Sequence, residues 1–204
     1  QGQEKRVYMP SDDQLSIDSL ARIEQGIPTA LMIDPSLIQK RLKSIESRIP
    51  LVYNVHSHQY VEYFAFRKAA FTQHMLEKRD LYFPLYEKYL KQYNLPDELK
   101  YLSLIESGLE TKALSNKGAG GLWQFMPATA REYGLVVNGY IDERRDYIKS
   151  THAAARYLLN SYKVYHDWLL VLASYNGGLG NVNKAIRNSG SKNFWSLQYS
   201  LPGE

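Results

Sequence analysis

Apolar residues recur at helical spacing along most of this chain, and this periodicity constrains the fold more than any other feature of the sequence. Between residues 36 and 49, leucine and isoleucine follow a period close to 3.6 residues until Pro50 ends the pattern. Further helical patterns cover residues 60–71, 81–93, 146–165, 167–176 and 180–190. No convincing strand alternation accompanies them, so the sequence predicts a mostly α fold.

The overall composition narrows the classes of protein that the chain can belong to. Hydrophobic residues make up 44% and charged residues 23% of the 204 positions, which is ordinary for a globular protein with a sizeable core. No apolar run approaches the roughly 18 residues that a membrane-spanning helix requires. The lack of cysteine excludes disulfides and fits either a reducing compartment or a bacterial envelope protein without bridges. The net charge of +4 is mild and no Lys/Arg block stands out, so nucleic acid is not an expected partner.

The periodicity also suggests how the chain is divided. Residues 1 to about 35 carry weaker patterns, and "IPTALMIDPS" is typical of a loop between short helices. We expect an N-terminal helical extension over residues 1–80 and a compact helical domain over residues 81–204. The chain starts at Gln1 without an initiator Met or a signal peptide, so we expect a processed or trimmed product.

A carboxylate ends the apolar face of one predicted helix. Leu99 and Leu102 share that face with Glu106, and Ile105 lies alongside. Gly108 then stops the helix, which puts Glu106 in its last turn. Apolar surroundings and the negative end of the helix dipole both favour the protonated acid, which is the form that general acid catalysis requires. A glutamate at a helix end can equally reach solvent without any function. The neighbouring sequence therefore has to distinguish a catalytic Glu106 from a surface residue.

Two glycine-rich segments follow this helix. The first has three glycines in residues 118–121, where backbone can approach a ligand closely, and continues with Trp123 as a stacking surface and Gln124 as a hydrogen-bonding group. The second is "ASYNGG", a helix end with glycines beyond it that places Tyr175 and Asn176 where they can face a cleft. Either segment alone is more typical of a plain turn than of a binding site.

Together these segments resemble a known family. "IESGL", "GAGGLWQFMPATA" and "ASYNGG", in this order and spacing, are similar to the lytic transglycosylase domain of the SLT type, which has a lysozyme-like fold. The stretches "YNLPDELKYLSLIES" and "DERRDYIKSTHAAARYL" look like its membrane-bound D-type branch. The resemblance is strong over about residues 81 to 190 and fainter back to residue 49. It implies cleavage of peptidoglycan between N-acetylmuramic acid and N-acetylglucosamine, without a metal or an organic cofactor.

The resemblance also implies the site residues. Glu106 is the expected catalytic acid and then base, with Ser107 supporting its orientation. The expected substrate-binding residues are Ser107, Gly121, Trp123, Gln124, Tyr175 and Asn176. This chain carries Trp123 where many relatives carry methionine, and a glycine after Asn176 where alanine is common; both changes keep the polar groups.

The resemblance extends to partners and location. It implies a monomer in the periplasm or at the outer membrane of a bacterial envelope, acting on peptidoglycan glycan strands. Membrane attachment would need a segment that is not in this chain. Because relatives continue beyond the segment "FWSLQYSLPGE", often with cell-wall-binding repeats, we also expect the C-terminus to be truncated.

Two alternatives stay open at this point, a hydrolytic muramidase and a non-catalytic glycan-binding module. Ordinary glycosidases use two carboxylates, whereas the motifs supply one, which favours 1,6-anhydromuramic acid ends over hydrolysis. The carboxylates that follow Glu106 between and beyond these motifs do not belong to them: Glu110 lies beyond the helix stop, Glu132 lies in the next helix, and Asp142, Glu143 and Asp146 lie in an arginine-rich run. We expect that run to form ion pairs that support the fold. His56 and His58 do not share a helix face and predict no metal site.

Overall fold

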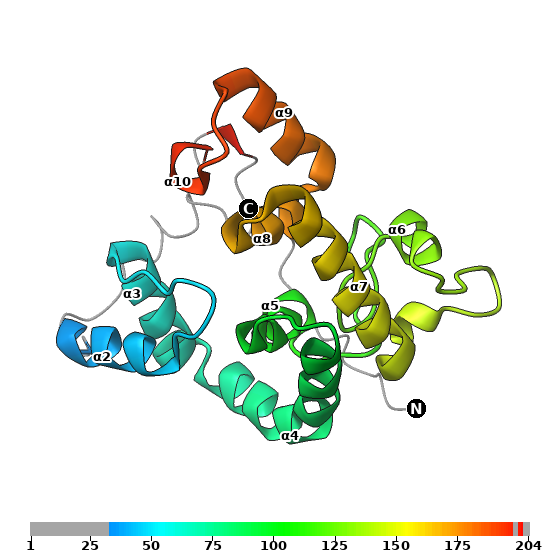
Figure 1. Cartoon of the computed structure of the whole chain (residues 1–204). Helices are drawn as coiled ribbons and strands as arrows, with labels where there is room; N and C mark the ends of the chain where they lie inside the picture. The colour runs from blue at the N-terminus through cyan, green and yellow to red at the C-terminus, as the bar shows by residue number, and fades with distance from the viewer. Residues whose placement is uncertain (1–32, 198–199, 202–204) are drawn as a thin grey trace.

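The computed structural model describes residues 33–197 and 200–201 of the chain. The α-helices in this part are α2 (Pro35–Ile45), α3 (Val55–Glu62), α4 (Ala69–Gln92), α5 (Leu102–Ser107), α6 (Pro127–Glu132), α7 (Tyr147–Tyr165), α8 (Trp168–Gly177), α9 (Leu179–Ser189) and α10 (Phe194–Leu197) (Figure 1). A π-helical turn η3 (Tyr63–Arg67) joins α3 to α4, and 3-10 helices η4 (Asp97–Tyr101) and η5 (Glu143–Arg145) precede α5 and α7. Outside the helices, the described residues form only isolated β-bridges, which confirms the mostly α prediction. The loop and short helices expected before residue 33 lie outside the described residues.

Aspartate side chains fix where three of the helices begin. The carboxylates of Asp34, Asp146 and Asp167 accept backbone N–H bonds at the starts of α2, α7 and α8. These caps satisfy amide donors that have no partner inside the helix. Each cap therefore sets the residue at which the chain turns into its next helix.

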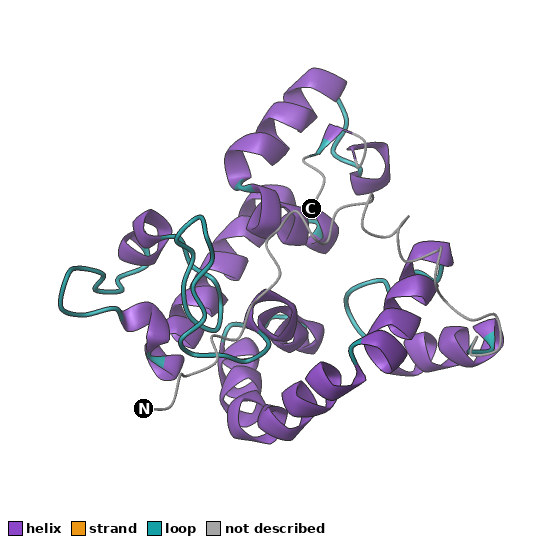
Figure 2. Ribbon diagram, turned by 180° about the vertical axis from the view of Figure 1, so that it is seen from behind, coloured by secondary structure: helices purple, strands orange, loops and turns teal. Residues whose placement is uncertain are grey.

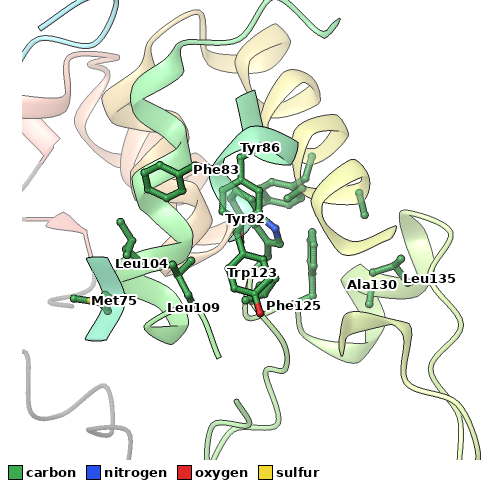
Figure 3. Packing of buried hydrophobic residues seen from close by; sticks show 14 residues of the cluster. Met75, Tyr82, Phe83, Tyr86, Leu104, Leu109, Trp123, Phe125, Ala130 and Leu135 are labelled. Atoms are coloured by element: carbon green, nitrogen blue, oxygen red, sulfur yellow. The ribbon is translucent and has the colours of Figure 1, made fainter. Parts of the chain in front are cut away.

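Two hydrophobic clusters form the core. The first joins α4, α5 and the loop after α5 to α6 and the first half of α7, and its aromatic side chains surround Trp123 (Figure 3). The second joins the end of α4 to α8, α9 and α10, with Trp168 stacked on Tyr162 at a ring distance of 4.1 Å. Leu102 of α5 and Tyr175 of α8 pack against both clusters. The expected catalytic helix therefore lies where the two clusters meet.

The N-terminal helices lie to one side of the remaining chain (Figure 2). One carboxylate oxygen of Glu98 accepts backbone N–H bonds from Ser47, Arg48 and Ile49 at 2.8, 2.7 and 3.2 Å. Burial by itself raises the pKa of Glu98, but these backbone donors outweigh it and lower the pKa. The Glu98 carboxylate thus helps to hold the segment after α2 to the domain, together with a hydrogen bond of 2.9 Å from the Arg48 guanidinium group to the Asn94 carbonyl oxygen.

The helix α4 runs without interruption through the boundary expected between residues 80 and 81. Its interior contains Pro84, which removes a helix hydrogen bond and bends the helix. The ribbon of α4 follows an arc in both views of the whole chain (Figures 1 and 2). The division of the chain at residue 80 stays a prediction.

Candidate active site

Glu106 lies in the last turn of α5, as the sequence predicted. The helix ends at Gly108, which adopts a left-handed conformation with φ of 60° and donates its N–H to the carbonyl oxygen of Leu104. A side chain on Gly108 would meet the ring of Phe71 at 2.9 Å, so a residue of α4 packs directly on this turn. Glu106 itself is half-buried. The turn that carries the carboxylate is therefore held by the Gly108–Leu104 hydrogen bond and by the packing of Phe71.

The buried face of α5 differs from the predicted one. Leu99 is buried as expected, but Ile105 is 58% exposed, so its predicted place beside the core face was wrong. Ser103 and Ser107 occupy the buried face instead, and both are fully buried. The reason is that this face meets the backbone of the following loop and not an apolar surface. Serine hydroxyls can donate hydrogen bonds to the buried carbonyl groups of that backbone.

A polar network joins α5 to this loop. The Ser103 and Ser107 hydroxyls each donate to the carbonyl oxygen of Leu122 at 2.9 Å. The hydroxyls of Tyr86 and Ser103 share a further hydrogen bond of 3.0 Å. Burial raises the pKa of Tyr86 well above its ordinary value, so this phenol stays neutral. Ser107 therefore supports the helix that carries Glu106 but does not reach solvent, and it does not line a substrate site in this structure.

The glycine-rich loop closes around Arg144, which is 5% exposed. Its guanidinium group donates to the carbonyl oxygens of Gly118 and Phe125 at 2.6 and 3.0 Å and forms a bidentate pair with Asp142. A side chain on Gly121 would meet the Arg144 carbonyl oxygen at 1.9 Å. A glycine is therefore required at position 121 because the loop packs closely against η5. The expected close approach of its backbone to a sugar does not explain the glycine. The ion-paired role predicted for this acidic and basic run is confirmed for Asp142 and Arg144.

Trp123 is a core residue. Its side chain is 1% exposed, its indole N–H donates to the Thr151 hydroxyl at 3.0 Å, and its ring lies 4.9 Å from that of Tyr86. Figure 3 shows Trp123 enclosed by the aromatic residues of the first cluster. The expected role of Trp123 as a stacking surface for sugar is wrong for this structure, because no face of the ring reaches solvent.

Tyr175 and Gln124 both donate hydrogen bonds to backbone carbonyl groups of the loop after α5. The Tyr175 hydroxyl donates to the Trp123 carbonyl oxygen at 2.6 Å, and its ring packs edge-on against Tyr157. Gln124 adopts a positive φ of 45°, and its side-chain amide donates to the Gly121 carbonyl oxygen at 2.9 Å. Both side chains are half-buried, while Asn176 is exposed.

The charge of Glu106 acts on Tyr175. Burial raises the pKa of the Tyr175 phenol well above its ordinary value, and the negative charge of Glu106 raises the pKa further. The end of α5 and the end of α8 thus carry a carboxyl group and a phenol that interact electrostatically although they are 69 positions apart in the sequence.

Sequence reasoning missed the residues that hold this arrangement in place. Tyr86, Ser103, Thr151 and Tyr157 are ordinary helix residues in the sequence, and only the packing reveals their hydrogen bonds. The high tyrosine content, with 17 copies, was the one available signal.

His58, one of the two histidines that predicted no metal site, has a structural role. His58 is buried and shares hydrogen bonds with the Tyr53 hydroxyl at 2.9 Å and the Glu62 carboxylate at 3.1 Å. Glu62 also accepts the backbone N–H of Ile33 at 2.8 Å. Among the described residues, no three His, Cys, Asp or Glu side chains gather as metal ligands.

Comparison with known proteins identifies the domain. The family model of the transglycosylase SLT domain matches residues 84–198. The chain belongs to the transglycosylase SLT domain family. The match contains α5, the glycine-rich loop and α8, so every predicted site residue lies inside the SLT domain. It begins at Pro84, within α4, and thus leaves α2, α3 and the start of α4 outside.

Two relatives match parts of this chain. The chain is 41% identical over 120 residues to membrane-bound lytic murein transglycosylase D of Escherichia coli (strain K12), a match that covers 56% of this chain and 26% of that protein. It is 40% identical over 100 residues to a putative tributyltin chloride resistance protein of Alteromonas sp. (strain M-1), covering 48% of each chain. The chain thus spans about a quarter of the first relative and half of the second.

A solved structure shares the fold. An inactive mutant of lytic transglycosylase Slt from Pseudomonas aeruginosa superposes with a TM-score of 0.52 at 16% sequence identity, covering 93% of this chain and 40% of that one. The likeness supports the predicted lysozyme-like helical architecture. Within the described residues, no helix is both long and apolar enough to cross a lipid bilayer.

Proposed function

We propose that this protein is a lytic transglycosylase that cleaves the β-1,4 bond between N-acetylmuramic acid and N-acetylglucosamine in peptidoglycan. The observation that carries the proposal is the position of Glu106, half-buried in the last turn of α5 at the junction of the two core clusters, within an SLT domain. The first relative is named as a lytic murein transglycosylase, which agrees with this substrate. The corresponding location is the bacterial envelope, and we propose that the protein works there as a monomer.

In the proposed reaction Glu106 acts twice. As an acid it donates a proton to the glycosidic oxygen while the bond to C1 of the muramic acid breaks and positive charge develops there. As the resulting carboxylate it removes the proton from the C6 hydroxyl of the same sugar, and that oxygen bonds to C1. The tethered hydroxyl has a high effective concentration, so no water is consumed. The products are a free N-acetylglucosamine hydroxyl and a 1,6-anhydromuramic acid end.

The surrounding side chains support a single-carboxylate mechanism. Glu110 forms ion pairs with Lys78 and His74, and Asp142 is held by Arg144. Glu143 pairs with Lys149, and Asp146 caps α7. Each of these acids has a structural contact, and we assign the reaction to Glu106 because it lies in the SLT domain at the end of α5.

Two neighbouring groups are proposed to hold the sugar. Gln124 uses its amide N–H₂ group on Gly121, and within the described residues its side-chain oxygen accepts no hydrogen bond, so we assign that oxygen to a sugar hydroxyl or amide. Asn176, which is exposed at the end of α8, is proposed to contact the reacting sugar. We propose that three buried residues do not contact the sugar and instead support the loop and the helix that carry the site: Gly121, Ser107 and Trp123.

The decisive experiment is digestion of purified peptidoglycan followed by mass spectrometry of the fragments. Anhydromuramic acid ends are expected. Fragments heavier by one water, with reducing muramic acid ends, would identify a hydrolytic muramidase. Tight glycan binding without any fragments would identify a non-catalytic binding module.

A further inference from the structure

A second concave region lies between α4 and the η4–α5 segment. It has a volume of about 580 Å³, and Leu76, Phe83, Pro84 and Leu104 form its apolar wall. Tyr101 stands at its rim, and Glu106 does not line it. The cavity is therefore distinct from the arrangement of Glu106 and Tyr175 described above.

Pro84 lines the cavity from within α4. Proline has no N–H to give to the carbonyl group four residues earlier, and its ring pushes that carbonyl away, which bends the helix. The displaced carbonyl belongs to Asp80, which also lines the cavity. Pro84 thus leaves a backbone acceptor at the edge of the cavity without its usual helical donor.

Tyr101 presents an aromatic surface in a fixed orientation. Its side chain is 47% exposed, and its ring meets that of Phe83 edge-on at 5.5 Å with an interplanar angle of 82°. The Lys100 ammonium group lies 5.5 Å from the Phe83 ring centre and 5.6 Å from that of Tyr101. A half-exposed ring held in this way suits the flat C–H surface of a sugar, because little side-chain freedom is lost on binding.

The charges around the cavity cancel. Arg79 and Lys100 contribute two positive charges, and Asp80 and Glu87 contribute two negative charges. Lys100 is held by Glu87 at 2.7 Å and by Asp97 at 2.6 Å, and Arg79 pairs with Asp80 at 3.1 Å. Ion-paired groups still donate and accept hydrogen bonds, but this neutral set has no surplus charge with which to attract a charged ligand.

Two exposed side chains follow one another along the helical segment beside the cavity. Tyr101 and Ile105 are four residues apart on one helical segment, so they are neighbours on its surface, and they are 47% and 58% exposed. Glu106 follows Ile105 directly, roughly 8 Å along the helix axis from Tyr101. Exposed side chains therefore continue from the cavity along the η4–α5 segment.

We propose that this cavity binds an uncharged N-acetylated amino-sugar segment of a glycan strand, with Tyr101 as its stacking platform. The inference rests on the proposed function for the identity of the polymer, and it adds a second contact with that polymer away from the scissile bond. Hydroxyl and acetamido groups would meet the paired charges and the Asp80 carbonyl group. The sugar rings would meet Tyr101 and the apolar wall.

The test is a titration of the Glu106→Gln variant with the neutral tetrasaccharide of N-acetylglucosamine, followed by NMR of the backbone amides. Signals of residues 76–80 and 100–105 are expected to shift. Tyr101→Ala is expected to weaken binding at these signals by roughly a factor of ten, whereas Tyr101→Phe retains the ring and most of the affinity. Leu76→Glu, a change at a half-exposed wall position, provides a second variant with the same expected loss.

Tyr140→Ala is the matched control, since Tyr140 is 99% exposed and lies away from the cavity. Unshifted signals at residues 100–105 with saturating tetrasaccharide would overturn the inference. Shifts there with a charged muropeptide but not with the tetrasaccharide would overturn it too, and would assign the cavity to the stem peptide. A lack of peptidoglycan cleavage by the unmodified protein is a separate result, which would remove the proposed function and leave the binding at the cavity in place.

Discussion

The Tyr175 hydroxyl donates a hydrogen bond of 2.6 Å to the backbone carbonyl oxygen of Trp123. This bond joins the end of α8 to the loop after α5, and Tyr175 is also the residue whose pKa responds to the charge of Glu106. The position of the phenol therefore depends on a backbone atom of a residue whose side chain is buried in the core.

Glu106→Gln is expected to abolish peptidoglycan cleavage while the protein keeps its fold. Glutamine has nearly the same shape but can neither donate the acid proton nor accept a proton as a base. Loss of general acid catalysis alone lowers rates about 10²- to 10⁴-fold, and one residue serves both steps here. The measurement is release of fragments from purified peptidoglycan, with Glu132→Gln on the surface of α6 as the control. Retention of most activity by Glu106→Gln would rule out the assignment.

Tyr175→Phe is expected to lower turnover with a modest loss of stability. The change removes the hydrogen bond to the Trp123 carbonyl oxygen and leaves that acceptor without this partner, at a cost of about 1 to 3 kcal/mol. Activity per folded molecule and the thermal midpoint should be measured together, with Tyr140→Phe at a fully exposed position as the control. A large fall in the midpoint with unchanged activity per folded molecule would make Tyr175 a core residue only.

Trp123→Phe is expected to act on stability. The indole N–H loses its bond to Thr151, and the smaller ring leaves a gap beside Tyr86, which together cost about 2 kcal/mol. For a chain of this size that corresponds to roughly 4 to 8 °C in Tm. Glycan affinity, measured well below the melting transition, should be retained. A weaker affinity at unchanged Tm would restore the stacking role that the sequence suggested.

Gly121→Ala is expected to be strongly destabilising, by more than about 2 kcal/mol. The new methyl group would lie 1.9 Å from the Arg144 carbonyl oxygen, and the backbone φ of 79° is unfavourable for alanine. Gly139→Ala is the matched control, because nothing lies within 4 Å of its added methyl group and its φ is not in the left-handed region. Chemical denaturation of both variants tests the difference, and equal stabilities would contradict the packing described for the loop.

The ion pair between Asp142 and Arg144 predicts an acid-dependent term in stability. Hydrogen bonds from Arg144 lower the pKa of Asp142 below its ordinary value of 3.8, against the opposing effect of burial, and Arg145 lowers it further. A lowered folded-state pKa means that the stabilisation is present above about pH 4 and is lost as the pH falls through the folded-state value. The Tm difference between the unmodified protein and Asp142→Asn should therefore be constant near neutrality and narrow below pH 4.

Asp80→Asn provides the comparison for this experiment, because Asp80 is 82% exposed in its pair with Arg79. Exposed pairs contribute little to stability, so its Tm difference should stay small across the same pH range. A difference for Asp142→Asn that does not narrow in acid would show that the Arg144 pair is not what stabilises the loop.

The sequence by itself determined the helical class, the turn that carries Glu106, and the family. Period-3.6 spacing, capping residues and Gly108 act over a few neighbouring residues, so their effects can be predicted without knowledge of the fold. Three short motifs in a fixed order sufficed to identify the SLT domain, because the sequence of each is visible without the fold. It also located the acidic and basic run that became the pair of Asp142 with Arg144.

Only the tertiary structure decided which side chains of those motifs are buried. Trp123 and Ser107 sit in the motifs beside the candidate acid, yet both are buried, since α7 and the Leu122 carbonyl group occupy the space around them. Ile105 is exposed because Ser103 takes the buried face of α5. Burial depends on contacts between segments far apart in the sequence, and the periodicity of one helix cannot report what the neighbouring chain will bring against it.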